Sequence, residues 1–359
     1  MKVDFTVLAM LLAILGYSAI ANLYSSLSTT DAILLLFGVA VVLFLGFLVL
    51  WDRFSKFGKD RRKRIETIKE FPESLLRPDP NSIALGIESD LGIPIFLPDS
   101  IRSRHVHILG ATGSGKTESV VLNFIRQDVA RGLGAIILDA KGDSSFLWSL
   151  QKNVPPGKLR VFDLGAEDSL AYNPLSVGSP LEAAQRLFSS LTWSEEYYKS
   201  KAFTALQRLF QIHFEKYSKN PRLLELADYL ENPEAYTSVT STETYPKKLA
   251  ERDFMELSGL RDQLNGLCTG HLAKILSPDG AGDLILEEAA RGGVLYFRLQ
   301  SLLSPQLVAT LGKLLINHLN YLAGTAHRNK YDEEGTAKRA NLIPTFLDEF
   351  ASFACPEFA

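Results

Sequence analysis

The clearest chemical signature in the chain is a glycine-rich stretch that ends in lysine and threonine. Residues 110–117 read GATGSGKT and match the phosphate-loop pattern G-x-x-x-x-G-K-[ST] at every fixed position. Successive backbone N–H groups of such a turn face inward and bind anions, and the N-terminus of the helix that follows adds partial positive charge. Lys116 can then reach the β- and γ-phosphates of ATP, and the Thr117 hydroxyl can ligate Mg²⁺. The residues expected to bind the nucleotide are Gly110, Ala111, Thr112, Gly113, Ser114, Gly115, Lys116 and Thr117.

An acidic pair near the end of the chain supplies the second half of such a site. The apolar run 342–347 is followed directly by Asp348 and Glu349. We expect Asp348 to hold the Mg²⁺ together with Thr117. We expect Glu349 and Lys116 to be the catalytic residues, with Glu349 orienting and deprotonating the attacking water. The alternative is that the two acids cap a helix that follows them.

A charged cluster and two histidines are further candidates. Residues 139–143 read DAKGD and follow an expected strand, at the edge of the sheet where open α/β proteins bind ligands. This cluster can contact a nucleotide, a neighbouring subunit or a translocating strand; alternatively, Asp143 caps the next helix and Lys141 is solvated. His105 and His107 are expected on one face of a strand, and since no third ligand is near them in the sequence, we expect no metal site there.

The segments around these residues predict an α/β fold. Apolar runs of strand length alternate with helical periodicity, which is typical of a mostly parallel, doubly wound sheet. Before this sheet, residues 82–98 read as a β-hairpin. Over residues 181–278 the apolar residues recur at three- and four-residue spacing, so we expect an all-helical insertion whose stripe from Phe203 to Phe214 faces a core. The expected strands of the sheet are 105–109, 135–138, 159–162, 293–297 and 342–347, and the expected helices include 118–131, 144–151 and 305–322.

Two uncharged apolar runs open the chain. Residues 5–23 and 32–51 are each long enough to cross the hydrocarbon core of a membrane as a helix, and the link between them is short and polar. We therefore expect a transmembrane hairpin. Seven lysines and arginines between Arg53 and Arg64 place the segment that follows, and with it both termini, in the cytoplasm. The alternatives are a cleaved signal peptide for the first run and, for the basic segment, a contact with DNA in addition to lipid head groups.

Composition limits the classes of function. The 359 residues carry a net charge of −3, so we expect any DNA to be handled by local loops or a channel and not by a broad basic face. Cys268 and Cys355 are the only cysteines, which indicates no disulfide framework and fits a reducing compartment. The expected segments are a transmembrane hairpin at 1–51, a basic cytoplasmic linker at 52–81, the first part of a nucleotide-binding domain at 82–180, an all-α domain at 181–284 and the second, incomplete part of the nucleotide-binding domain at 285–359.

The motifs together resemble one family. A two-span hairpin precedes HVHILG at 105–110 and the phosphate loop, and DAKGD at 139–143, YNPL at 172–175, a helical insertion and LDEF at 347–350 follow in that order. This order is similar to that of the coupling proteins of type IV secretion and bacterial conjugation. The resemblance implies a RecA-like P-loop ATPase with an all-α insertion domain, anchored in the bacterial inner membrane as a homo-hexamer. It also implies that the protein uses ATP with Mg²⁺ as cofactor, and that ATP hydrolysis moves single-stranded DNA, with its relaxase, into the type IV secretion channel.

The resemblance has further consequences. By motif position it assigns Lys116, Thr117, Asp348 and Glu349 to the ATPase site. The family's arginine finger and glutamine sensor follow the acidic pair, whereas this chain ends at Ala359. We therefore expect a truncated chain that hydrolyses ATP slowly or not at all, since an arginine finger contributes roughly 10³ to 10⁵ in rate. Two other functions stay open: a receptor that docks protein cargo on a secretion channel and uses ATP for assembly, and a septal-type chromosome translocase, which usually has more membrane spans and a long linker.

Overall fold

The structure is a computed structural model that describes residues 28, 30, 41, 44–48, 51, 80–88, 94–111, 113–302, 304–328 and 342–353. The chain divides into two compact units, Met1–Pro72 and Glu73–Ala359, and the elements below belong to the second unit. The two expected membrane spans lie almost wholly outside the described residues and stay a prediction, as do the five segment boundaries. Within the part of the chain that the structure describes, no helix combines the length and the apolarity needed to cross a membrane.

The described residues of the second unit form a parallel sheet of four strands in the order β4-β5-β3-β6. β3 is the inner strand between β5 and β6, so both of its edges are paired. The strands read as nearly continuous apolar runs because helices cover both faces of a parallel sheet. The strands span Ala135–Asp139 (β3), Leu159–Asp163 (β4), Val294–Arg298 (β5) and Thr345–Asp348 (β6). The predicted α/β fold with a parallel sheet is confirmed.

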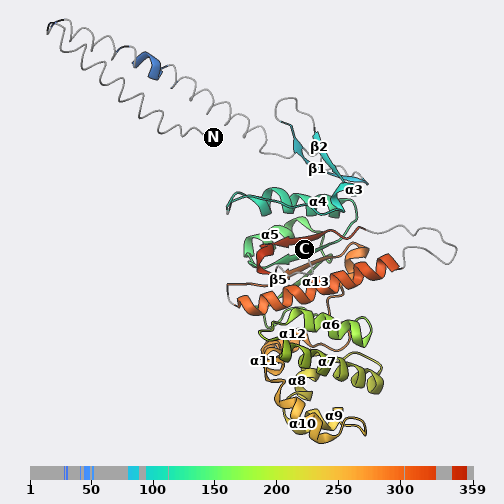
Figure 1. Ribbon diagram of the computed structural model, residues 1–359. Helices are drawn as coiled ribbons and strands as arrows, with labels where there is room; N and C mark the ends of the chain where they lie inside the picture. Colours follow the sequence, from blue (N-terminus) through green and yellow to red (C-terminus); the bar gives the residue numbers. More distant parts are fainter. Residues whose placement is uncertain are drawn as a thin grey trace. The chain divides into compact units, whose positions relative to one another are not determined.

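The two faces of the sheet belong to two separate hydrophobic cores. Adjacent residues of β5 show this division, because successive side chains of a strand point to opposite faces. Tyr296 packs on one face with α4 (Leu122–Ala130) and α5 (Ser144–Asn153). Phe297 packs on the other face, in a core that includes α13 (Pro305–Arg328). Figure 1 shows α4 and α5 on one side of the sheet and α13 on the other.

The chain between β4 and β5 is helical, as predicted. It opens with α6 (Pro180–Ser190), whose first turn is fixed by a reciprocal capping box between Ser179 and Glu182. α6 packs against α13 on one side and against the long helix α7 (Glu196–Tyr217) on the other. The helices that follow are α8 (Leu223–Tyr229), α9 (Pro233–Thr240), α10 (Lys247–Met255), α11 (Ser258–Leu267) and α12 (His271–Leu276). A 3₁₀ turn, Leu286–Arg291, then leads into β5.

The predicted apolar stripe of α7 is only partly in the core. Leu206 and Phe210 are fully buried. Phe203 is half-buried against Phe188, with ring centroids 4.7 Å apart. Phe214 is 38% exposed because the last turn of α7 extends beyond the core, where residues 214–217 are all exposed. The prediction that the whole stripe faces a core therefore holds for Leu206 and Phe210, holds in part for Phe203, and is wrong for Phe214.

The predicted hairpin is present and is fastened to α4. It consists of β1 (Ser82–Ile87) and β2 (Pro94–Pro98), which pair antiparallel. The side-chain amide of Gln127 in α4 donates to the carbonyl of Ala84 at 2.9 Å and accepts from its N–H at 2.6 Å. One side chain thus satisfies two backbone groups of the hairpin, and both bonds are buried.

A buried charge cluster joins α3 (Asp99–Arg102) to α4. Asp128 has no exposed surface and accepts hydrogen bonds from Arg102 and from Arg131, the latter at 2.7 Å. Arg131 also pairs with Asp99 at 2.8 Å. Two positive and two negative charges therefore balance, and such a network is stable only while every member has a partner.

The segment that precedes the phosphate loop differs from the prediction. Residues 105–111 form no strand, His105 has a left-handed backbone with φ of +75°, and Leu109 is 81% exposed. The described parallel sheet consists of β4, β5, β3 and β6, and residues 105–111 pair with none of these strands. The predicted strand at 105–109 was wrong, and His105 and His107 share no strand face.

Candidate nucleotide-binding site

The phosphate loop is closed by glycines in the left-handed region. Gly113 has φ of +75° and Gly115 has φ of +82°, a conformation that residues with a side chain rarely adopt. A Cβ atom on Gly110 would lie 2.7 Å from the Ser114 hydroxyl and 3.1 Å from the Lys116 side chain. The backbone is therefore folded closely on itself, as an anion-binding turn of backbone N–H groups requires.

Lys116 begins the helix that leaves the loop. The predicted single helix at 118–131 is in fact a π-helical turn, Lys116–Val121, that continues as α4. Lys116 Nζ donates to the carbonyl oxygens of Gly110 at 2.8 Å and Ala111 at 3.1 Å, so the cation lies over the loop. The first N–H groups of a helix have no partner within the helix and carry its partial positive charge. A phosphate bound there would accept hydrogen bonds from the Lys116 ammonium group and from these N–H groups. Thr112, the remaining residue of the loop, lies outside the described residues.

Thr117 and Asp348 meet in space although 231 positions separate them in the sequence. The Thr117 hydroxyl donates to Asp348 Oδ2 at 3.0 Å. Mg²⁺ holds its oxygen ligands at 2.0–2.1 Å in an octahedron, so two neighbouring ligand oxygens lie about 2.9 Å apart. The observed separation, and a donor set of one hydroxyl and one carboxylate, fit a magnesium ion. The two residues expected to hold Mg²⁺ are therefore brought together.

The acidic pair lies at the end of β6 as expected, although this strand is shorter at its start than predicted. β6 begins at Thr345, later than the predicted 342, because Pro344 has no N–H for the ladder. The Pro344 carbonyl still accepts from the N–H of Ile136 at 2.9 Å. Glu349 has φ of +52° and an exposed side chain, and its carboxylate does not cap the 3₁₀ turn Phe350–Ser352. The capping alternative is thus not observed for Glu349, whose role in catalysis stays a prediction.

Each strand of the described parallel sheet ends on a charged residue. Register places Asp139 of β3 beside Asp348 of β6 on one edge and beside Arg298 of β5 on the other, and Arg298 lies beside Asp163 of β4. All four belong to the carboxyl edge of the sheet, where open α/β folds bind ligands. The edge therefore places three carboxylates and one guanidinium in one row.

Asp139 is buried and holds the loop that follows it. Its carboxylate accepts from the N–H groups of Lys141 and Gly142, each at 2.9 Å, and of Asp143 at 3.2 Å. The Tyr296 hydroxyl donates to it at 2.6 Å. Burial and the neighbouring carboxylate raise the pKa of Tyr296, which keeps this phenol protonated as a donor. The first residue of the DAKGD cluster thus supports the backbone of its neighbours.

The structure contains the cap that one of the two alternatives for the DAKGD cluster predicts, whereas a contact of the cluster with a nucleotide, a subunit or a strand stays a prediction. Asp143 Oδ1 accepts from the Ser145 N–H at 2.9 Å and begins α5, and Lys141 Nζ pairs with Asp143 at 2.9 Å. The hydrogen bond from Lys141, followed by that from Ser145, lowers the pKa of Asp143 to about 2. Lys141 is exposed, with 57% of its side chain accessible. Its hydrogen bond to Asp143 raises its pKa, and the charges of Asp139 and Asp348 raise it further.

Sequence reasoning missed a polar network at the far end of the same edge. Arg298 donates to Asp163 at 2.7 Å, to the Gly142 carbonyl at 2.8 Å and to the Ser144 hydroxyl at 2.8 Å. Gln300 donates to Asp163 at 2.6 Å. The available signal was that the apolar runs of β4 and β5 each close on a charged residue, as β3 and β6 do.

The two histidines of the loop segment make no metal site in the structure. His105 and His107 are exposed. Over residues that the structure describes, no group of three or more histidine, cysteine, aspartate or glutamate side chains is placed to hold a metal ion.

The fold and this site together define an α/β domain of the phosphate-loop class. Residues 85–306, more than half of the chain, match the family described as "Helicase HerA, central domain". The chain belongs to this family. Among curated proteins, no sequence matches the chain.

Solved structures resemble the chain in fold. The plasmid coupling protein TrwB in complex with ADP and Mg²⁺ aligns over 79% of this chain and 64% of its own, with 14% identity and a TM-score of 0.50. TrwB with a non-hydrolysable ATP analogue aligns over 79% and 65%, with 18% identity and a TM-score of 0.48. VirB4 of Thermoanaerobacter pseudethanolicus aligns over 78% and 70%, with 16% identity and a TM-score of 0.49. The chain thus spans somewhat less than two thirds of the TrwB chains.

Proposed function

We propose that this chain binds ATP with Mg²⁺ at the phosphate loop and is an ATPase subunit. The observation that carries the proposal is the 3.0 Å contact between Thr117 and Asp348, which joins the loop to the acidic end of β6. TrwB, whose fold is similar, has been described in complex with ADP and Mg²⁺. When bound, Mg²⁺ would be held by Thr117 and Asp348 and would neutralise charge on the phosphates.

The residues of the loop have distinct tasks in this proposal. Lys116 would exchange the two loop carbonyls for phosphate oxygens, which are charged acceptors and form stronger hydrogen bonds. The glycine conformations let backbone N–H groups approach the phosphates closely. Glu349 is exposed and directly follows Asp348, and we assign to it the removal of a proton from the attacking water.

We further propose that the ATPase acts in type IV secretion as a coupling protein at the bacterial inner membrane. TrwB is a plasmid coupling protein, and the family of this chain is named for a helicase. The subunit would move single-stranded DNA, with its relaxase, into the secretion channel as part of a homo-hexamer. The apolar runs 5–23 and 32–51 would anchor it with both termini in the cytoplasm.

The experiment measures nucleotide binding and phosphate release by the purified chain, with and without single-stranded DNA. Lys116→Ala should abolish both, and Glu349→Gln should bind ATP but release phosphate more slowly. Lys274→Ala removes an exposed lysine of α12 as the matched control and should leave both unchanged. If Lys116→Ala binds and hydrolyses ATP at the parental level, the site is wrong. If single-stranded DNA leaves hydrolysis unchanged while a cargo protein accelerates it, the chain is a cargo receptor.

A further inference from the structure

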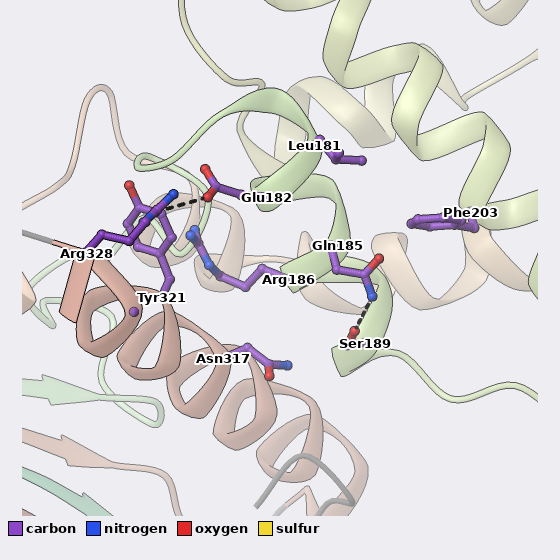
Figure 2. A pocket seen from close by; sticks show the side chains of 10 residues that line it. Leu181, Glu182, Gln185, Arg186, Ser189, Phe203, Asn317, Tyr321 and Arg328 are labelled. Atoms are coloured by element: carbon purple, nitrogen blue, oxygen red, sulfur yellow. Dashed lines mark hydrogen bonds and ion pairs between the residues drawn. The ribbon is translucent and has the colours of Figure 1, made fainter. Parts of the chain in front are cut away.

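A cleft away from the phosphate loop lies between α6, α13 and the start of α7. It has a volume of about 820 Å³, which is within the usual range for sites that bind small organic molecules. Figure 2 shows side chains from two facing helices converging on it. Its lining residues are Leu181, Glu182, Gln185, Arg186 and Ser189 from α6, Phe203 from α7, and Asn317, Tyr321, Gly324 and Arg328 from α13.

The floor of the cleft holds a buried cation without an anionic partner. Arg186 is 3% exposed, and within the described part of the chain it forms no ion pair, although the charges of Glu182 and Glu287 act on it from farther away. Its terminal nitrogens donate only to neutral carbonyls, those of Pro174 at 2.8 Å and Val177 at 3.2 Å. Its Nε is buried and has no hydrogen-bond partner. A guanidinium stays charged in a protein, so this position favours an anion in the cleft.

A second cation stands at the rim and is only loosely held. Arg328 has 64% of its side chain exposed and contacts Glu182 at 3.4 Å. Glu182 is already engaged by the backbone N–H of Ser179 at 2.9 Å, as part of the cap of α6. Arg328 can therefore leave Glu182 for a stronger acceptor, and a phosphate takes two parallel hydrogen bonds from a guanidinium.

The walls of the cleft offer aromatic faces and side-chain amides. The guanidinium carbon of Arg186 lies over the Tyr321 ring, 5.0 Å from the ring centroid. Figure 2 shows the two side chains next to each other. Phe203 is half-buried at the α7 side. The amides of Gln185 and Asn317 line the cleft between these rings and carry both donors and acceptors.

We propose that this cleft binds a nucleotide unit, with its phosphate on Arg186 and Arg328 and its base against Tyr321 and Phe203. Aromatic stacking contributes to binding of any base, and amide side chains can hydrogen-bond to base edges. An acidic peptide would use the arginines alone and leave the rings and amides without a role. The proposal rests on the proposed function, because it gives the single-stranded nucleic acid a site distinct from the ATP site. The shared chemistry also admits a free mononucleotide.

The test places a carboxylate in the cleft without removing a structural side chain. Gly324 is a helical glycine with open space where a Cβ would be, so Gly324→Glu fills the cleft with negative charge and raises helix propensity. Gly266→Glu in α11 is the matched control, since Gly266 is also helical, exposed and unobstructed. Binding of a fluorescent oligothymidylate is followed by anisotropy in the absence of ATP, and circular dichroism checks that both variants fold.

We expect Gly324→Glu to weaken oligothymidylate binding at least about tenfold and Gly266→Glu to bind as the parent does. Arg328→Gln should weaken binding and lower the slope of log affinity against log salt by about 0.7. If free thymidine monophosphate competes, the ligand is a mononucleotide, and if it does not compete, the ligand is a strand. Both outcomes support a cleft that binds phosphate and base. Equal binding by Gly324→Glu and the parent overturns the proposal. So does a polyglutamate that binds in the cleft where oligothymidylate does not.

The same preparations separate this inference from the proposed function. ATP binding by the parent is measured in parallel, with Lys116→Ala as the comparison. A parent that binds ATP through Lys116 but shows no effect of Gly324→Glu on the oligonucleotide overturns the cleft alone. A parent that binds ATP equally well after Lys116→Ala overturns the ATP site, whatever the oligonucleotide does.

Discussion

Replacement of Asp348 by asparagine isolates the charge that the acidic strand end contributes to the nucleotide site. Asparagine has nearly the same shape, so Oδ1 can still accept a hydrogen bond from the Thr117 hydroxyl, which lies 3.0 Å from the carboxylate in the native chain. What is lost is the negative charge. If Thr117 and Asp348 hold one Mg²⁺, the substitution should weaken nucleotide binding only when Mg²⁺ is present.

The magnitude follows from the kind of interaction removed. A hydrogen bond to a charged group is worth about 1.5–3 kcal/mol net, compared with about 1 kcal/mol for a neutral pair. Because asparagine keeps the neutral bond, the loss is the difference of about 0.5–2 kcal/mol. This corresponds to roughly a twofold to thirtyfold weaker affinity, since 1.4 kcal/mol is a factor of ten. Thr117→Val removes the hydroxyl with little change in shape. Because both residues would act on one ion, the double variant should lose less than the sum of the two single variants, with a coupling of about 0.5–3 kcal/mol.

The assay titrates each variant with a fluorescent ATP analogue, once with Mg²⁺ and once with a chelator. Asp279→Asn serves as the control, because Asp279 is an exposed carboxylate that pairs with Arg222 away from the loop. The reasoning is refuted if Asp348→Asn weakens binding equally with and without Mg²⁺. It is also refuted if the losses of Asp348→Asn and Thr117→Val add fully, since the two residues would then act independently.

The remaining predictions concern buried ionisable groups. Asp128→Asn leaves two buried arginines without a full partner and should lower the free energy of unfolding by about 3–5 kcal/mol, measured by urea denaturation; a change below 1 kcal/mol would contradict the network. Asp139→Asn should speed amide hydrogen exchange at residues 141–143, whose N–H groups it accepts, whereas unchanged protection would show that the loop holds itself. Burial lowers the pKa of His318 to about 3, so below pH 6.5 the unfolded chain binds a proton that the folded chain does not. Stability should therefore fall by about 1.4 kcal/mol per pH unit as the pH drops from 6.5 toward 3, and His318→Gln should remove this slope.

The local part of the site could be predicted from sequence because its chemistry depends on neighbours in the chain. The phosphate loop, the helix after it and the acidic end of β6 are all defined by short-range patterns. The cap formed by Asp143 is likewise a local hydrogen bond, to the N–H two positions on. In these cases the residue types specify the backbone conformation, as with the left-handed Gly113 and Gly115.

The rest could not be predicted because it depends on the pairing of distant segments. The run at 105–109 has strand composition, but a strand also needs backbone pairing with a neighbour, and this run pairs with none of the four described strands of the parallel sheet. The register that sets Arg298 beside Asp163 is likewise a property of the assembled sheet. The cleft joins α6 to α13, more than a hundred residues later, and no periodicity in either helix identifies the other.

The separation of Thr117 from Asp348 is set by β3 and not by the loop itself. β6 is fixed by its pairing with β3, in which Leu138 and Asp139 lie beside Leu347 and Asp348. The helix that carries the loop is fixed by the packing of α4 on the same strand, where Ile125 and Ile137 are both fully buried. Close-packed interiors transmit small displacements. A cavity in this core would therefore change the distance between Thr117 and Asp348. The exposed loop therefore gains its precision from an apolar strand that carries no part of the proposed chemistry.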